Sequence, residues 1–596
     1  PTFGQLSRGG NIFAIERIDW ENETILLEGR HSPDDRYSLE SHPYGDAGEH
    51  YYSPDTRFIL TDSITDFTAG KVHSRLESGH GQHALRWLDP ESPTVPSITP
   101  ISEDQADRYE ELLNALEVGD GHTLQESQVD TILEGLSTRV NLVHGPPGTG
   151  KTTTTAFAIL LRLVDHLEQG DTVLMSGNTH RSVDNLLDRI AEVEDEFRDI
   201  AERLGFDVPE LTLVKVASEG PGGRVVETGT SGNIRQLDGY RDDGVLIIGG
   251  TVNGILKQMG TLDDSATFGG DDGEFYADEL IVDEASMLVF PHFLALSTTV
   301  APDGRILLAG DHRQLSPIIA HDWEEEDRPP VELYQPYSSA FEAVHDLADH
   351  DDMGPDSIRL SRLQYTFRLP PVIRALVSQL YRSYDDTELE GELAERPPDV
   401  ADNGDPFTNI WEQDTGLFLL THDENESRVS NPFEAEVIEQ LLDSPAADEL
   451  DDGSVAVLTP HTAQRSHLQE RLEEELDGPV DVVDTVERLQ GGEAENVIVS
   501  ATASDPTAIG LNEEFLLDLN RSNVAFSRTE SRLIVICSQS LLNHIPPEVE
   551  EYNAAMLWKS LRSICSIQRG EVGIGDHEVQ MLVPDPESEE IQEVLD

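Results

Sequence analysis

A glycine-rich turn at residues 145–152 constrains the fold of this chain more than any other feature of its sequence. The turn reads Gly-Pro-Pro-Gly-Thr-Gly-Lys-Thr and fits the phosphate-loop pattern G-x-x-x-x-G-K-[ST]. It follows the apolar run Val140–Val143 and opens a helix expected over Thr152–Leu163, the context that the pattern requires. Backbone N–H groups of such a turn face phosphate oxygens, helped by the helix N-terminus. The predicted nucleotide-binding residues are Gly145, Pro146, Pro147, Gly148, Thr149, Gly150, Lys151, Thr152 and Thr153.

Two side chains of this turn have distinct expected roles. Lys151 is expected to reach the β- and γ-phosphates, and Thr152 to ligate Mg²⁺. A second motif, Leu280-Ile-Val-Asp283-Glu284, is an apolar strand that ends in two acids. Asp283 at that position is expected to hold Mg²⁺ through its hydration shell. Glu284 is expected to polarise the attacking water as a general base.

Apolar strand-length runs alternate with amphipathic helical segments from about residue 120 onward. This alternation predicts α/β folding, with parallel sheets covered on both faces. A break at residues 320–357, which are acidic and contain proline, separates two such units in tandem. The expected strands are Val140–Val143, Thr172–Met175, Val245–Ile248, Leu280–Val282 and Ile306–Ala309 in the first unit, and Leu417–Leu420, Val455–Leu458, Val497–Val499 and Leu533–Ile536 in the second.

The ends of the chain show other patterns. Short strand-like runs at Asn11–Ile15, Thr24–Glu28 and Arg57–Leu60 predict a small N-terminal β domain, of barrel type, over residues 1–100. The first α/β domain is expected over 101–355, with residues 191–243 as an acidic, glycine-rich insertion. The second is expected over 356–583, and residues 584–596 are expected to form a solvated acidic tail.

Charge is the most unusual property of the composition. The chain has 596 residues and a formal net charge of −76, and its acidic residues are spread over its whole length. Lysine is limited to Lys71, Lys151, Lys215, Lys257 and Lys559. This composition resembles proteins of extreme halophiles, because at about 1 M salt the Debye length is only about 3 Å and self-repulsion is screened. Acidic interaction surfaces are the alternative explanation; we prefer the first, so the charge does not exclude a nucleic-acid partner.

Several classes of protein are excluded or disfavoured. Cys537 and Cys565 are the only cysteines, too few for a disulfide framework, a cysteine zinc module or a four-cysteine iron–sulfur cluster. No run of about 18 apolar residues predicts a membrane span. Residues 1–8 lack a basic-then-apolar signal pattern. We therefore expect a cytoplasmic protein without a membrane partner, and a monomer.

Further motifs, taken together with the two above, resemble the superfamily 1 helicases. They include Gly310-Asp311-His-Arg-Gln314, Asp484-Thr485-Val-Glu-Arg-Leu-Gln490-Gly-Gly-Glu493 and Asn520-Arg521-Ser-Asn523-Val-Ala-Phe-Ser-Arg528. The similarity is greatest to the B-type branch, which includes the nonsense-mediated-decay RNA helicase and the Okazaki-fragment nuclease–helicase. It runs in order from Gln128 to Arg528 and implies two tandem RecA-like P-loop domains that bind ATP between them.

The resemblance also implies roles for single residues. Gln128, in Leu124-Gln-Glu-Ser-Gln128, would contact the adenine edge, and Phe367, in Gln364-Tyr-Thr-Phe367-Arg368, would stack on adenine. The family has Gln-Tyr-Arg where this chain has a phenylalanine in the aromatic position. Gln314 would sense the γ-phosphate, and Glu493 would contact the nucleotide's ribose or phosphate edge. Arg368 and Arg528 would be arginine fingers donated by the second domain.

A last group of residues resembles the loops with which the family grips a single nucleic-acid strand. Hydroxyl groups and backbone N–H groups suit this task in high salt, where counterion release adds little affinity. Ordinary helix caps are the alternative explanation for these loop residues. The candidates are Thr179, His180, Thr251, Thr459, Pro460, His461 and Thr485.

The function implied is that of an ATP-dependent helicase or translocase that moves 5′→3′ on single-stranded nucleic acid. DNA is favoured over RNA only by the breadth of the family. An ATP-gated clamp or remodelling scaffold would use the same motifs without processive unwinding, so the sequence leaves this alternative open.

Overall fold

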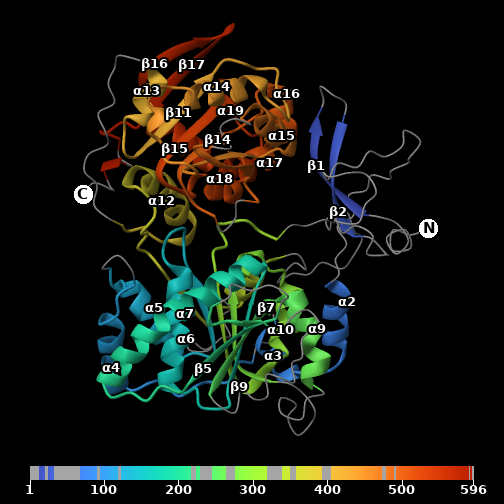
Figure 1. Cartoon of the computed structure of the whole chain (residues 1–596), viewed down its shortest axis with the longest axis vertical. Coiled ribbons are helices and arrows are strands. Elements are labelled where there is room, and N and C mark those ends of the chain that lie inside the picture. The colour runs from blue at the N-terminus through green and yellow to red at the C-terminus, as the bar shows by residue number, and fades with distance from the viewer. Residues whose placement is uncertain are drawn as a thin grey trace, which may run out of the picture.

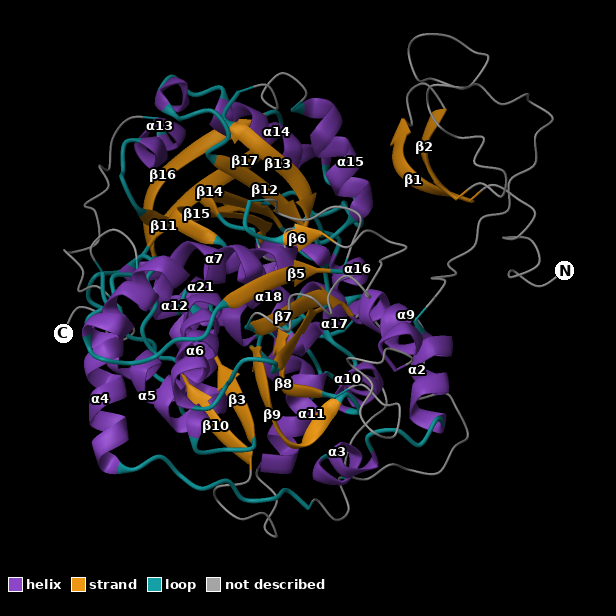
Figure 2. Cartoon of the chain, turned by 60° about the horizontal axis from the view of Figure 1, so that its bottom comes forward, coloured by secondary structure: helices purple, strands orange, loops and turns teal. Residues whose placement is uncertain are grey.

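A computed structural model describes residues 12–19, 24–31, 68–89, 94–118, 122–216, 223–227, 244–263, 276–317, 338–348, 358–391, 405–472, 478–488, 492–588 and 591–592. Two α/β bodies dominate it, the first from the blue-to-green part of the chain and the second from the yellow-to-red part (Figure 1). Helices flank the strands of both sheets (Figure 2). The prediction of two tandem parallel-sheet domains is therefore confirmed in its main features. None of the described helices combines the length and apolarity that crossing a bilayer demands.

The sheet of the first body is parallel throughout its described strands, in the order β10-β3-β9-β8-β4-β7-β5-β6. Alternate residues of each strand enter different cores: Leu142 packs on one face of β3 and Val143 on the other. This period of two explains why the strands read as continuous apolar runs. The strands are β3 (Val140–His144), β4 (Thr172–Gly177), β5 (Leu211–Lys215), β6 (Val226–Glu227), β7 (Val245–Thr251), β8 (Ala277–Asp283), β9 (Val300–Gly310) and β10 (Ile358–Arg362).

Helices cover both faces of this sheet (Figure 2). One face carries α4, α5, α6 and α7, and the other carries α9, α10 and α11. Helix α4 begins directly after Ser102, because the Ser102 hydroxyl and the Gln105 side chain form a capping box. The helices are α4 (Glu103–Asn114), α5 (Glu126–Leu136), α6 (Lys151–Asp165), α7 (His180–Arg203), α9 (Val252–Asp263), α10 (Phe290–Ser297) and α11 (Ala340–Ala348).

The second sheet has the order β13-β12-β14-β15-β11-β17-β16 and is parallel except for β16 and β17. Helices α12, α18, α19 and α21 pack on one face, and α13, α14 and α15 on the other. Its strands are β11 (Gly416–His422), β12 (Val455–Thr459), β13 (Val480–Thr485), β14 (Ala494–Ser500), β15 (Thr529–Ser538), β16 (Ile567–Ile574) and β17 (His577–Val583). Its helices are α12 (Pro371–Asp385), α13 (Pro406–Trp411), α14 (Pro432–Leu442), α15 (Thr462–Arg471), α16 (Pro506–Leu511), α17 (Glu513–Leu516), α18 (Leu519–Phe526), α19 (Gln539–Asn543), α20 (Val549–Ala554) and α21 (Met556–Ile564).

The predicted N-terminal β domain of barrel type is not confirmed by the described residues, which contain two of its expected strands. Strands β1 (Ile12–Asp19) and β2 (Thr24–His31) pair antiparallel where two of the three strands are expected. The third expected strand, Arg57–Leu60, lies outside the described residues. Assigning the whole of residues 1–100 to a β domain is wrong, because α2 (Ala69–Glu77) and α3 (Gln82–Trp87) are helices in the core of the first α/β body.

Three other boundaries also need correction. Residues 191–203 continue α7, and Leu211–Lys215 joins the first sheet, so this part of the expected insertion belongs to the core. Helix α7 buries an apolar stripe of Val193, Phe197 and Ile200. Acidic residues on its outer face made this stripe hard to recognise in the sequence. Strand β10 pairs with β3, so the first body extends beyond residue 355. The C-terminal segment is not wholly solvated, since Ile591 is buried in the second core.

Candidate functional site

The predicted phosphate loop and the predicted acidic motif meet at one edge of the first sheet. Strands β3, β9 and β8 are hydrogen-bonded neighbours and run parallel. The segments that follow them therefore emerge side by side, at the edge where ligands bind in open α/β sheets. This places the phosphate loop, Asp283 with Glu284, and Asp311 with Gln314 at a common edge.

The loop itself has the backbone geometry that a phosphate cradle needs. Gly148 and Gly150 both have φ +74°, a conformation that side chains other than glycine's rarely adopt. A Cβ on Gly145 would lie 2.2 Å from Lys151 Cγ, so the lysine folds back over the glycine. The Lys151 ammonium group donates to the Gly145 carbonyl at 2.6 Å. Lys151 is thus held above the turn that it is predicted to serve.

Gln128 braces this loop. Its side-chain Nε2 donates to the Thr149 carbonyl at 3.2 Å and to the Thr154 hydroxyl at 3.1 Å. Its Oε1 accepts from the backbone N–H of Gln125 at 2.9 Å, which closes a capping box at the start of α5. Both ends of the buried amide are therefore engaged in supporting the turn. Its contact with adenine stays a prediction.

The acidic pair Asp283 and Glu284 combines a strained backbone with a perturbed carboxyl group, as functional sites often do. Glu284 has φ +52°, a left-handed conformation that costs free energy in a residue with a side chain. Burial, together with the neighbouring Glu284 charge, raises the pKa of Asp283 to about 7. The Glu284 carboxylate has a buried oxygen without a hydrogen-bond partner in the described structure. Such a pair fits a site that receives a cation and a water molecule.

A cleft connects this acidic pair to loops of both bodies. Its first-body lining includes Thr152, Asp283 and Glu284, and its second-body lining includes Glu487 and Arg488. The nucleotide side of the site therefore opens directly onto the segment predicted to hold nucleic acid. The remaining lining residues are Asn178, Thr179, Arg181, Ser182, Asn185 and Met287.

Gln314 and Arg528 meet across the two bodies. The Arg528 guanidinium donates to Gln314 Oε1 at 3.3 Å and to the Gly492 carbonyl at 3.4 Å. Arg528 is buried, and desolvation together with the nearby Arg368 charge lowers its pKa to about 10. The structure thus brings together two residues that the sequence separates by more than 200 positions.

Arg368 lies in the segment that joins the two bodies. A Cβ on Gly148 would lie 2.5 Å from Arg368 Cβ, so this segment passes directly over the phosphate loop. The Arg368 guanidinium pairs with the Glu493 carboxylate and donates to the Ser527 carbonyl at 3.5 Å. Both predicted fingers and Glu493 therefore form one group beside the loop.

Phe367 belongs to an aromatic cluster at the same place. Its ring lies 4.9 Å from that of Tyr365 and 6.1 Å from that of His122, between centroids. Its backbone N–H donates to the Gly148 carbonyl at 2.9 Å, and the side chain is 42% exposed. An aromatic face left exposed beside a phosphate loop is suited to stacking on a base.

The first-body candidates for nucleic-acid contact lie at the ends of two neighbouring strands. Thr179 and His180 are exposed after β4, although the Thr179 hydroxyl also caps α7 by accepting from the Ser182 N–H at 3.1 Å. Thr251 ends β7, and its hydroxyl accepts from Gly254 N–H at 3.3 Å. The alternative role of helix capping therefore applies to Thr179, and equally to Thr251, which directly precedes α9.

The second-body candidates are divided between surface and interior. Thr459 is fully buried, with its hydroxyl 2.8 Å from that of Thr502, and Thr485 is also buried. Pro460 and His461 are half-buried, and the His461 ring lies 5.2 Å from that of Phe515. Phe515 in turn lies under the Arg521 guanidinium at 4.0 Å. An aromatic platform, which the sequence did not identify, thus lies beside His461.

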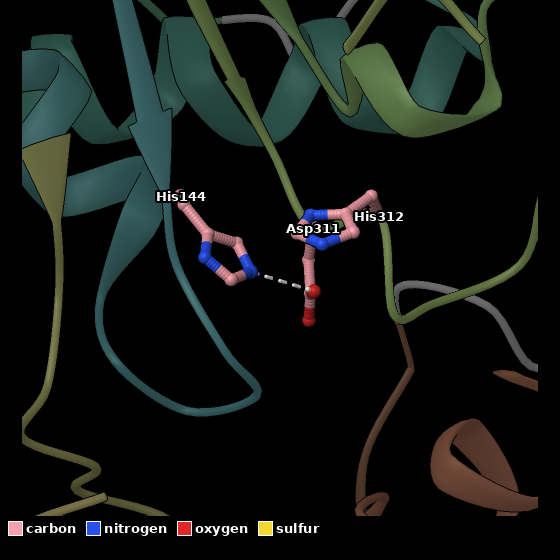
Figure 3. Close-up of side chains that lie close together, drawn as sticks. All are labelled: His144, Asp311 and His312. Atoms are coloured by element: carbon pink, nitrogen blue, oxygen red, sulfur yellow. Dashed lines mark hydrogen bonds and ion pairs between the residues drawn. The ribbon is translucent and has the colours of Figure 1, made fainter. Parts of the chain in front are cut away.

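Sequence reasoning missed a buried polar cluster at the same sheet edge. His144 Nε2 lies 3.1 Å from Asp311 Oδ1, and the His312 ring lies beside both (Figure 3). Tyr381 and Asp385, from α12, contact Asp311 and His312 respectively. Asp311 and His312 stand in a motif that the sequence singled out, but Tyr381 lies inside a helix and nothing in its local pattern marks it.

Comparison with protein families finds two matches along the chain. Both are described as AAA domains, one over residues 128–320 and the other over residues 338–540. The first begins at Gln128 and lies within the first body, whereas the second begins at α11 of the first body and continues through most of the second.

Known proteins similar to this chain align across both bodies. The Arabidopsis thaliana DNA replication ATP-dependent helicase/nuclease JHS1 is 24% identical over 82% of this chain and 33% of its own length. The Dictyostelium discoideum regulator of nonsense transcripts 1 is 26% identical over 74% of this chain and 32% of its own length. The DNA polymerase alpha-associated DNA helicase A of Saccharomyces cerevisiae is 25% identical over 81% and 72%.

This chain spans about a third of the first two of these relatives. The solved structure of the PRRSV helicase aligns over 69% of this chain and 54% of its own, at 15% identity and a TM-score of 0.30. The two AAA domain matches, and the helicases that align with this chain at 24–26% identity, support a superfamily 1 helicase of the branch of the regulator of nonsense transcripts and the DNA replication helicase/nucleases.

Proposed function

We propose that this chain couples ATP hydrolysis, in the cleft between its two bodies, to 5′→3′ movement along single-stranded DNA. The observation that carries the proposal is the contact between Arg528 of the second body and Gln314 of the first, beside the phosphate loop. A cation supplied by one body to a nucleotide held by the other makes hydrolysis depend on closure of the cleft.

Three cations of the chain would stabilise the transferring phosphoryl group. Its transition state spreads negative charge over three oxygens, and an arginine finger is worth roughly 10³–10⁵ in rate. Lys151 stands over the loop, and Arg368 and Arg528 lie close enough for the charge of one to lower the pKa of the other. Glu284 would orient and deprotonate the attacking water, since its buried oxygen has no other partner in the described structure.

The oxygen donors of the cleft fit Mg²⁺. Thr152 and Asp283 line the same cleft, and hydroxyl and carboxylate oxygens are the ligands that this ion accepts. The pKa of Asp283 is raised because its carboxyl group is buried beside the Glu284 carboxylate. A divalent cation would offset the repulsion between these two acids. When held by Thr152 and Asp283, Mg²⁺ would neutralise part of the phosphate charge.

The nucleic-acid strand would lie where the cleft leaves the nucleotide. Asn178, Thr179 and Arg181 line the cleft from the first body, and Arg488 lines it from the second. His461 and Phe515 form an aromatic platform that suits base stacking, which is worth about 1–3 kcal/mol per base. DNA is chosen over RNA on family breadth, and 5′→3′ polarity on the resemblance to B-type members.

The test is ATP turnover by the wild type and by Lys151→Ala, in molar KCl and with single-stranded DNA present. We expect the wild type to be stimulated by DNA and Lys151→Ala to lose turnover, because the phosphates lose their nearest cation. Lys257→Ala is the matched control, since Lys257 is an exposed lysine on α9. Retained turnover in Lys151→Ala would contradict the proposal.

Unwinding of a duplex distinguishes a helicase from the alternative, an ATP-gated clamp. A labelled duplex with either a 5′ or a 3′ single-stranded overhang would be offered with ATP, and matched RNA strands would replace DNA in parallel. We expect opening only from the 5′ overhang. DNA-stimulated turnover without opening of either duplex would favour the clamp, and stronger stimulation by RNA would reverse the choice of substrate.

A further inference from the structure

The buried polar cluster at Asp311 is a hydrogen-bonded junction between the two bodies. Asp311 Oδ1 accepts from His144 Nε2 at 3.1 Å and from the backbone N–H of Arg313 at 3.0 Å. Its Oδ2 accepts from the Tyr381 hydroxyl at 2.6 Å and from Gln314 Nε2 at 3.0 Å. Four donors therefore converge on one fully buried carboxylate.

This set of donors argues against a metal ion among His144, Asp311 and His312, although the three lie close together (Figure 3). Both Asp311 oxygens are already occupied by N–H and O–H groups. The His312 Nε2 is engaged with Asp385 at 2.8 Å, and its ring stacks on Phe341 at 5.9 Å between centroids. The Asp311 carboxylate is therefore saturated by hydrogen bonds, and Tyr381 supplies one of its donors.

Tyr381 reaches this carboxylate from the other body. Helix α12 packs in the core of the second body, together with α18 and α21. It lies where the second body meets the first (Figure 1). The Tyr381 hydroxyl donates to Asp311 and accepts from Asn523 Nδ2 at 2.9 Å. Asn523 Nδ2 also donates to the Arg313 carbonyl at 2.7 Å. The hydroxyl thus joins a first-body carboxylate to a second-body amide.

The chain of contacts then returns to the second body through Gln314. Gln314 Nε2 shares Asp311 Oδ2 with Tyr381, so the carboxylate fixes which way the amide points. Its Oε1 is thereby presented to Arg528, which donates to it at 3.3 Å. Asn523 and Arg528 come from the same helix α18 and the turn after it, five positions apart. The hydrogen bonds of Tyr381 and Arg528 thus link the two bodies at two points, and Asp311 and Gln314 connect these points within the first body.

We propose that Tyr381 is a positioning residue whose hydroxyl, by bridging Asn523 and Asp311 when the bodies close, orients Gln314 for its contact with Arg528. This rests on the proposed function and identifies how closure is communicated to the phosphate-sensing glutamine. Burial and the Asp311 charge raise the pKa of Tyr381 well above its ordinary value, which keeps the phenol protonated and able to donate. Opening of the cleft breaks the Tyr381 and Arg528 contacts together.

The experiment compares Tyr381→Phe with the full-length wild type in ATP turnover, with and without single-stranded DNA. Removing a hydrogen bond to a charged group is expected to lower kcat between about tenfold and a hundredfold. The KM for ATP is expected to change by less than about twofold, since Tyr381 has no contact with the phosphate loop in the described structure. Stimulation by DNA is expected to fall in parallel with kcat, because it depends on closure.

Tyr109→Phe is the matched control for loss of a buried phenol. Tyr109 is also buried and donates to a carboxylate, Asp165, at 3.1 Å, but it lies in α4, on the outer face of the first body. It should lose similar thermal stability without losing kcat. If Tyr381→Phe fails to fold, Asn523→Ser removes the other end of the bridge and should lower kcat in the same way.

Wild-type kcat and DNA stimulation in Tyr381→Phe would overturn the proposal, as would equal losses of kcat in Tyr381→Phe and Tyr109→Phe. A wild type that turns over no ATP would contradict the proposed function instead, so the two failures are distinguishable.

Discussion

Arg528 donates a hydrogen bond to Gln314 at 3.3 Å, although the two residues belong to different sheets and are separated by 214 positions in sequence. The contact lies at the edge where β3, β8 and β9 end, and it is shielded from water. A buried cation next to a polar amide at a nucleotide edge is costly unless something anionic joins it. Glu284, Glu493 and Asp311 already lie near this cation, and the γ-phosphate of ATP would be a further anion beside it.

Arg528→Lys is expected to lower ATP turnover at least about a hundredfold, because one ammonium cannot replace a planar guanidinium. Burial and Arg368 already lower the pKa of Arg528 to about 10, and a lysine in the same place starts from a lower pKa and loses its charge more readily. Arg471→Ala is the control, since Arg471 forms an ion pair with Glu439 on the far face of the second sheet. Turnover in single-turnover kinetics is the measurement, and an unchanged rate in Arg528→Lys would contradict the role.

Gly148→Ala is expected to abolish nucleotide binding. The residue has φ +74°, and an added Cβ would lie 2.5 Å from Arg368 Cβ and 2.6 Å from the Thr366 hydroxyl. Gly205→Ala is the control that distinguishes backbone strain from steric crowding. Gly205 also has a positive φ, +81°, but an added Cβ there would meet no atom within 4 Å. That control should lose roughly 1–2 kcal/mol of stability and keep its affinity for nucleotide. Binding of a fluorescent ATP analogue measures both variants, and equal effects would mean that crowding is unimportant.

Phe367→Ala is expected to raise the KM for ATP with little change in kcat. Stacking on a base is worth about 1–3 kcal/mol, which corresponds to a rise of roughly fivefold to a hundredfold. Tyr552→Ala is the control, because Tyr552 is an aromatic residue of similar exposure on α20. If the KM for ATP rises no more in Phe367→Ala than in the control, Tyr365 becomes the stronger candidate for the stacking residue.

The stability of the first body is expected to depend on the protonation of His166. Its two ring nitrogens lie 2.8 Å from the carboxylates of Asp165 and Glu279. Burial alone lowers the pKa of His166, but these hydrogen bonds outweigh it and raise the pKa above its ordinary value. Protonated His166 therefore contributes to the free energy of unfolding in full below the unfolded pKa of about 6.5. This contribution is lost as the pH rises through the pKa that His166 has in the folded protein.

His166→Gln tests this dependence by chemical denaturation at a series of pH values. The difference in unfolding free energy from wild type should be largest near about pH 6 and should shrink toward about pH 9. A difference for His166→Gln that does not vary with pH would mean that the ring acts only by packing.

Local patterns predicted the elements that carry the site, because each depends on short-range chemistry. The phosphate loop, the apolar strands β3 and β8 and the acids after β8 all occur where the sequence indicates. Strand β10 was missed, because its outer edge is only half-buried and its pattern is not continuously apolar. Helix α7 was partly read as an insertion, because acidic residues on its outer face mask the buried stripe. Thr459 was predicted to contact nucleic acid, but its hydroxyl is buried against Thr502.

The sequence by itself determined which residues stand at the ends of parallel strands, since alternation and turn chemistry are local properties of the chain. It could not determine which distant side chains share a proton or a carboxylate. Asp311 and Asn523 stand in motifs that the sequence singles out, but nothing in the sequence marks Tyr381 as the residue between them. Only the packing of α12 and α18 against the loop after β9 brings the three polar groups together. Hydrogen bonds act over about 3 Å, so their partners are set by how the two bodies dock rather than by the pattern of either one.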